Sequence, residues 1–132
     1  MAIRQIGGEV GTFLVTACNV TTTHQDAIAV GKFVKWSTSS NWAVDSCADS
    51  DPDLMLRGVV VGLNANSSIA TVKWLGWNRI AEFTISGTPV RGSSVETETA
   101  NGSKIAGTSN TTLAAYNYVV GVDATKVQAA FR

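Results

Sequence analysis

The sequence predicts an all-β protein, because three features of the chain agree. Apolar and polar residues alternate over short stretches, most cleanly in Ala81–Ser86, where Phe83 and Ile85 share one face. Turn-forming residues such as Asn101-Gly102 separate these stretches at short intervals. No segment longer than about six residues places its apolar residues at helical spacing. We therefore expect a small antiparallel sandwich or barrel with at most one short helix, within Thr111–Ala115.

A sequence motif recurs in the two halves of the chain. Each copy is a valine–glycine stretch followed by a further valine: Val61–Ala65 with Val72, and Val120–Ala124 with Val127. Recurrence at a nearly constant offset is typical of two copies of one structural unit. We therefore expect two degenerate β units, at residues 27–75 and 84–132.

The length of 132 residues is typical of one domain, so residues 9–132 are predicted to form a single β domain. Residues 1–8 precede it as an extended N-terminal arm. Strands are expected at residues 9–20, 27–36, 57–62, 69–75, 81–86, 95–99, 104–106, 118–122 and 127–131. The first strand should be covered on both faces, and 95–99 should be an exposed or edge strand.

Charge and hydropathy exclude several classes of partner. Lys plus Arg and Asp plus Glu both total 10, and a neutral chain argues against nucleic acid as a main partner. No apolar run is long enough for a transmembrane helix, so no membrane partner is expected. Met1–Gly8 lacks the apolar core of a signal peptide, which predicts synthesis in the cytoplasm with Cys18 and Cys47 reduced.

The chain lacks the residue sets on which common catalytic and metal sites depend. His24 is the single histidine and sits in a polar turn, where an ordinary surface role is expected. Asp49–Asp53 resembles the start of a calcium loop, but Leu54 replaces the required glycine and Val60 the required glutamate. We therefore expect no enzyme activity, no metal and no cofactor, and we interpret Asp45–Asp53 as a solvated surface loop.

The candidate contact residues lie in the arm and in two turns. The arm carries Ile3, Arg4 and Ile6 ahead of a glycine hinge, so it either stays disordered or orders on a neighbouring protein. Trp42 and Trp77 occupy turns, where each serves either a contact or local packing.

Two further tryptophans, Trp36 and Trp74, fall at strand ends beside polar neighbours. Core packing is the role expected of both.

The recurring motif resembles the small capsid decoration (head-stabilising, or cement) proteins of tailed bacteriophages. The resemblance rests on Val30–Val34 and Val61–Ala65 in the first half, and on Gly87–Val90 and Val120–Ala124 in the second. It implies a non-enzymatic structural protein, often a homotrimer, on the outer surface of the virion capsid. There it would bind the major capsid protein and clamp adjacent subunits. Such families commonly carry one unit, so two copies here are a departure that leaves the number of subunits open.

Two other interpretations remain open at this stage. The chain is alternatively a carbohydrate-binding β module of a phage adhesin or head fibre, with Trp42 and Trp77 as stacking platforms. It is also compatible with a plain structural subunit of a phage tail or baseplate.

Overall fold

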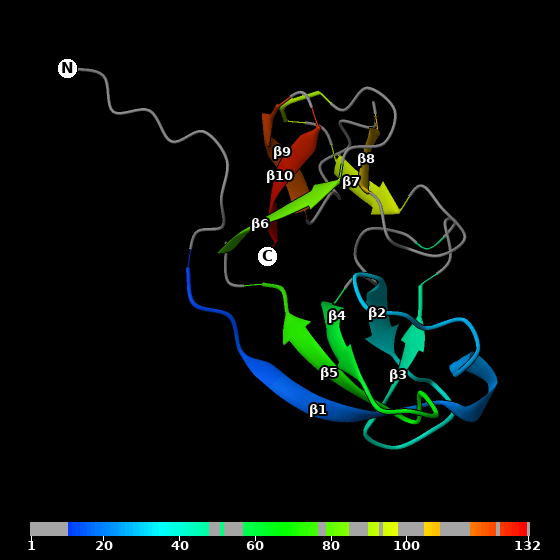
Figure 1. Cartoon of the computed structure of the whole chain (residues 1–132). Coiled ribbons are helices and arrows are strands. Elements are labelled where there is room, and N and C mark those ends of the chain that lie inside the picture. Colours follow the sequence, from blue (N-terminus) through cyan, green and yellow to red (C-terminus); the bar gives the residue numbers. More distant parts are fainter. Residues whose placement is uncertain are drawn as a thin grey trace.

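The computed structural model describes residues 11–47, 51, 57–76, 79–84, 90–92, 94–97, 105–108, 117–123 and 125–131. The arm with Ile3, Arg4 and Ile6 lies outside these residues, as do Trp77 and the segment in which a helical turn was expected. The described part is all-β, as predicted, with one short 3-10 turn, η1 (Thr22–His24). Its strands form a closed barrel and a separate sheet (Figure 1).

The barrel contains five strands in the order β1-β3-β2-β4-β5. They are β1 (Val15–Val20), β2 (Phe33–Trp36), β3 (Ala43–Ser46), β4 (Gly58–Leu63) and β5 (Ile69–Trp74). Four of the neighbouring pairs are antiparallel, as expected, but β1 and β3 are parallel. The reason is geometric, because strand direction cannot alternate at every pair around a closed ring with an odd number of strands.

The second sheet also has five strands, in the order β6-β10-β9-β7-β8. They are β6 (Arg79–Thr84), β7 (Ser94–Thr97), β8 (Ile105–Thr108), β9 (Asn117–Val122) and β10 (Lys126–Phe131). The strands that flank Asn101-Gly102 pair antiparallel, as a hairpin at that turn requires, from Ser94↔Thr108 to Thr97↔Ile105. The predicted turn itself lies outside the described residues.

The recurring motif adopts the same local structure in both sheets. In β4, Val60 pairs with Val72 and Gly62 with Thr71, so Val61 is an extra residue that bulges from the ladder. The bulge in β9 is equivalent, because Val119 and Gly121 pair with consecutive residues of β10 and Val120 is left over. Bulges bend and twist a strand locally. Both bulged valines are nearly half exposed.

Alternation along the barrel strands divides the core into two clusters. Consecutive residues of a strand point to opposite faces. Val34 and Val60 therefore belong to the cluster inside the barrel, whereas their neighbours Phe33 and Val59 belong to the cluster shared with the second sheet. The strands β2 and β4 thus each contribute side chains to both core clusters.

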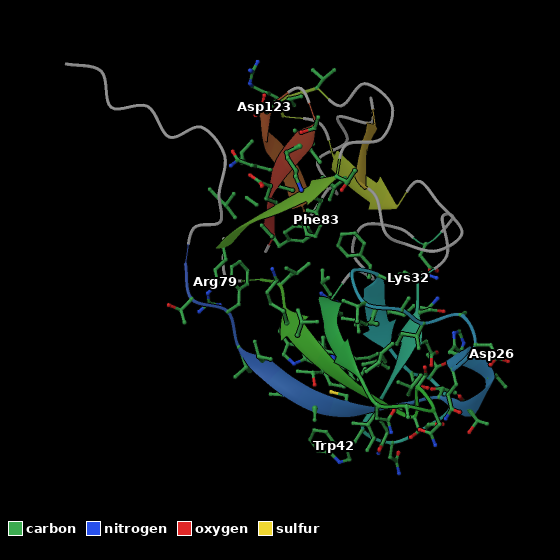
Figure 2. All side chains as sticks on the ribbon, viewed as in Figure 1. Asp26, Lys32, Trp42, Arg79, Phe83 and Asp123 are labelled. Atoms are coloured by element: carbon green, nitrogen blue, oxygen red, sulfur yellow. The ribbon has the colours of Figure 1, made fainter. Side chains whose placement is uncertain are left out.

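Three phenylalanines join the barrel to the sheet. The Phe33 ring lies 4.8 Å from that of Phe83 and 6.5 Å from that of Phe131, between ring centroids. Phe83 and Phe131 also meet edge to face at 5.6 Å. Figure 2 shows Phe83 in the region between the two sheets. All three rings are buried, so β2 of the barrel packs with β6 and β10 of the second sheet around one shared apolar centre.

The structure corrects three expectations about individual strands. One face of β1 is exposed, and Val15 on that face is 49% accessible, so the strand is not covered on both faces. The strand β2 begins at Phe33 instead of residue 27. Val95 is buried and β7 lies between β9 and β8, so this strand is not an edge. The burial of Val95 depends on the strands that flank β7 and on the shared core, which local alternation does not report.

Replacing Phe33 with alanine should lower the free energy of unfolding by about 3–5 kcal/mol, because a fully buried ring would leave a cavity between barrel and sheet. Chemical denaturation followed by tryptophan fluorescence measures this. Val30→Ala serves as the control, since Val30 is 61% exposed and its loss should change stability by less than about 0.5 kcal/mol. Equal effects of the two substitutions would contradict the shared core.

Two glycines of β4 should respond differently to alanine. A Cβ at Gly58 would collide with Cγ1 of buried Val72 and lie 3.0 Å from the carbonyl oxygen of Lys73. Gly58→Ala is therefore expected to cost about 1–3 kcal/mol. A Cβ at Gly62 meets Thr71 at an ordinary 3.5 Å, so Gly62→Ala should be close to neutral. The same denaturation experiment compares the two, and a neutral Gly58→Ala would show that β4 and β5 pack less closely.

Candidate functional site

An open pocket of about 490 Å³ lies against the barrel. Side chains from η1, from β2 and β3 and from the segments next to them line it: His24, Lys35, Trp36, Thr38, Asp45, Asp51 and Arg57. The pairing of β2 with β3 places Lys35 opposite Asp45, which brings two of these groups to one place.

Asp45 is the most buried polar side chain of the pocket, and its residue is 7% exposed. Its Oδ2 lies 3.8 Å from Nε2 of His24, which is too far for a hydrogen bond. Its Oδ1 has no hydrogen-bond partner among the described residues. A buried oxygen without a donor is costly, and such groups in folded proteins normally have a partner.

The imidazole ring of His24 is held in place through Nδ1, the ring nitrogen that faces away from Asp45. Nδ1 lies 3.0 Å from Oγ of Ser46, within hydrogen-bond distance. Ser46, His24 and Asp45 thus contain the residue types of a hydrolase triad, but the 3.8 Å separation breaks the relay between His24 and Asp45. Ser46 is also not among the residues that line the pocket. The arrangement positions His24 and does not make a nucleophile of Ser46.

Lys35 and Asp51 form an ion pair on the pocket wall. Nζ of Lys35 lies 2.9 Å and 2.8 Å from the two carboxylate oxygens of Asp51. This hydrogen bond raises the pKa of Lys35, against the opposing effect of burial, so the ammonium group stays charged.

Trp36 provides the aromatic surface of the pocket. Its ring stacks on Trp74, with centroids 4.6 Å apart and planes inclined by 17°. Trp74 is anchored in turn, because its Nε1 donates a hydrogen bond of 2.6 Å to Oγ1 of Thr16. Trp74 is partly buried against the barrel core, but Trp36 is 45% exposed, so core packing was the wrong expectation for Trp36.

Cys47 directly follows β3 and is buried in the cluster that the barrel shares with the second sheet. Burial raises the pKa of its thiol to about 12, the Asp51 carboxylate adds to this shift, and Lys35 opposes it. Both cysteines are free, as predicted. A thiol that stays protonated at neutral pH is a poor nucleophile, so Cys47 acts as a packing residue.

The residues singled out from the sequence lie elsewhere. Trp42, labelled in Figure 2, is 83% exposed and has a positive φ of 52°. It does not line the pocket. Ile3, Arg4, Ile6 and Trp77 fall outside the described residues.

The sequence interpretation named none of the described pocket residues as a contact residue, and for Asp45 and His24 it expected a surface role. Asp45 belongs to β3 and not to a solvated loop, and His24 is half-buried and held by Ser46. Apolar Val44 and Cys47 flank the stretch that contains Asp45, and this signal would have extended the strand through it.

Comparison with models of protein families gave no match, and comparison with curated proteins gave none either. Across the part of the chain that the structure describes, no group of three or more His, Cys, Asp or Glu side chains is placed to hold a metal ion. The described residues also include no helix with the length and hydropathy needed to cross a membrane.

Alkaline pH should destabilise the protein through Cys47. Its thiol ionises in the unfolded chain near its ordinary pKa of 9.0 but in the folded chain only near 12. The stabilising difference is complete below pH 9.0 and is lost as pH rises toward 12, by at most about 1.4 kcal/mol per pH unit. Denaturation at several alkaline pH values measures the slope.

Cys47→Ala should lower the free energy of unfolding at neutral pH, but it should make that free energy depend less on pH in the alkaline range. Cys18→Ala should keep the pH dependence of the wild type, because Cys47 remains. If the free energy of unfolding fell equally steeply with pH above 9.0 in the wild type and in Cys47→Ala, the role given to Cys47 would be contradicted.

Proposed function

We propose that this protein is a non-enzymatic capsid decoration protein of a tailed bacteriophage. It binds the outer surface of the head and stabilises contacts between major capsid protein subunits. The observation that carries the proposal is the shared structure of the recurring motif. The motif on which the resemblance rests forms a bulged strand in both sheets, and each bulge presents a valine, Val61 or Val120, to solvent.

Further exposed apolar side chains support a role in contact with another protein. Val15 and Ile69 lie on the same face of the β1–β5 pair, as the pairing of Asn19 with Ile69 and Val15 with Lys73 requires. They are 49% and 45% exposed. Burying apolar surface is favourable by roughly 25 cal/mol per Å², so a partner that covers this face would gain from it.

Weak individual contacts suffice for a protein of this kind. Linking several contacts on one head multiplies affinity by roughly 10²–10⁴, because each further contact forms within an existing complex. The formal charge of zero suits a mostly apolar interface. In this proposal the protein is synthesised in the host cytoplasm, forms a homotrimer and acts on the virion surface.

The proposal predicts co-sedimentation with empty expanded heads of the phage that encodes the protein. Binding should persist in about 0.5 M NaCl, because salt at this concentration screens charges but does not weaken apolar contacts. Deletion of residues 1–8, which removes Ile3, Arg4 and Ile6, should abolish binding. Light scattering of the free protein should give about three times 13.8 kDa.

Two surface variants sharpen this test. Val61→Asp and Val120→Asp place a charge on each bulge and should each weaken binding about tenfold or more, since a buried unpaired charge is costly. Asn66→Asp adds the same charge to an exposed turn of the barrel and should leave binding unchanged. Release of the protein by salt, or equal effects of all three variants, would contradict the proposal.

A further inference from the structure

The barrel closes through only the last part of β1. The parallel pairing of β1 with β3 consists of Asn19↔Ala43 and Val20↔Val44, and no described residue pairs with the earlier part of β1 on this side. This side faces away from β5, the other neighbour of β1 (Figure 1). The first half of β1 is therefore a sheet edge, although the second half closes the barrel.

The hydrogen-bond pattern identifies the backbone groups on this edge. In an antiparallel pair, every second residue directs its N–H and C=O to the neighbouring strand. The N–H of Trp74 donates to the carbonyl of Leu14, so the even-numbered residues of this segment bond to β5. Val15 and Ala17 direct their N–H and C=O groups to the other side, where these groups have no partner among the described residues. Both residues are exposed, so a strand from outside can reach them.

Trp42 ends the pairing of β3 with β1. Its carbonyl accepts a hydrogen bond of 3.2 Å from the N–H of Asn19, but its φ of 52° is a left-handed conformation that does not continue a strand. A bulky residue in this conformation carries backbone strain, and such residues cluster at functional sites. Trp42 is also 83% exposed. The turn thus leaves the edge at Ala17 open, with an exposed aromatic residue near it.

Exposed apolar side chains flank the open edge on both faces. Consecutive residues of a strand point to opposite faces. Leu14, which continues the ladder with β5, and Val15 therefore lie on opposite faces, and they are 64% and 49% exposed. An open edge of this kind is a template for an added strand. The occupant that fits is an extended peptide, because its backbone supplies both donors and acceptors.

The N-terminal arm has a sequence that suits this edge. Residues 1–10 contain no proline and span up to about 33 Å when fully extended, which is more than the open edge needs. Ile3 and Ile6 are three positions apart, so in an extended segment they point to opposite faces, as Leu14 and Val15 do. Each face of an added arm would therefore bring one isoleucine to an exposed apolar side chain.

The position of Gly11 favours the arm of another copy over the arm of the same chain. Gly11 packs against Arg79, since a Cβ added at Gly11 would lie 2.8 Å from Cγ of Arg79. Arg79 is the first residue of β6, in the second sheet, whereas the open edge lies on the side of β1 away from β5. The arm of the same chain starts beside the second sheet, so a neighbouring arm reaches the open edge more directly.

We propose that residues 1–10 of one copy add a strand to the open edge of β1 in a second copy, where they pair with Val15 and Ala17. Backbone hydrogen bonds hold the two copies together, and the isoleucines add apolar contacts. The inference deepens the proposed function and rests on it for one point, because it supplies the contact between copies in the proposed homotrimer.

Hydrogen exchange of the full-length protein, measured by NMR at a low and a high concentration, tests the pairing. The Val15 and Ala17 amides should exchange about tenfold more slowly at the high concentration, because association depends on concentration and protects them. The Thr16 and Cys18 amides are the matched control on the same strand. They already bond to β5, so they should exchange slowly at both concentrations and change less.

Two variants separate the edge from the rest of the fold. Ala17→Pro removes the N–H that the arm would bond but no bond to β5, and deletion of residues 1–8 removes the added strand. Light scattering should give the mass of one chain for both, 13.8 kDa in the case of Ala17→Pro. Ala17→Ser keeps the N–H and should associate as the wild type does. If circular dichroism shows that Ala17→Pro has lost its fold, the deletion decides, since it removes no described residue.

Three outcomes would overturn the proposal. They are a full-length protein that stays a single chain at both concentrations, association that survives the deletion, and protection of Val15 and Ala17 that does not depend on concentration. The last result would assign the edge to the arm of the same chain. No phage heads take part in these measurements. A protein that binds heads but shows no concentration-dependent protection would contradict this inference and leave the binding of the capsid intact.

Discussion

The contact of Phe33 with Phe83 and Phe131 joins the two sheets, and most of the described structure depends on it. Phe33 belongs to the barrel, yet its ring packs in the cluster shared with β6, β9 and β10. An isolated sheet buries neither of its faces, so the second sheet needs this shared centre to be stable, whereas the barrel also has its own cluster inside. The next residue, Val34, packs inside the barrel. One strand thus links the folding of both sheets.

The short barrel also determines where the pocket forms. After Val34, the strand β2 continues through Lys35 and Trp36, and its pairing with β3 places Asp45 and Val44 beside them. The stack of Trp36 on Trp74 brings together the ends of β2 and β5. The pairing of β2 with β3 that directs Val34 and Val44 into the barrel therefore also places charged and aromatic side chains close together in the pocket beside it. Cys47, the residue after β3, is buried in the cluster shared with the second sheet.

The capsid proposal rests on apolar side chains that the described strands leave exposed. They are the bulged valines Val61 and Val120 and, on the outer face of the β1–β5 pair, Val15 and Ile69. A protein fixed in many copies on a large particle repeats such contacts, and multivalency strengthens binding that is weak at each one.

The sequence by itself determined the all-β class, the β4–β5 hairpin and the pairing of β7 with β8 and of β9 with β10, because these follow from local alternation and turn residues. It also determined the recurring motif, although not that the motif bulges at Val61 and Val120. Only the tertiary structure decided that β1 and β3 run parallel, that Val95 is buried, and that Asp45 meets His24 across the pocket. These features depend on contacts between residues far apart in the chain, and the closure of the ring and the second sheet fix them, whereas local alternation reports only the two faces of a strand.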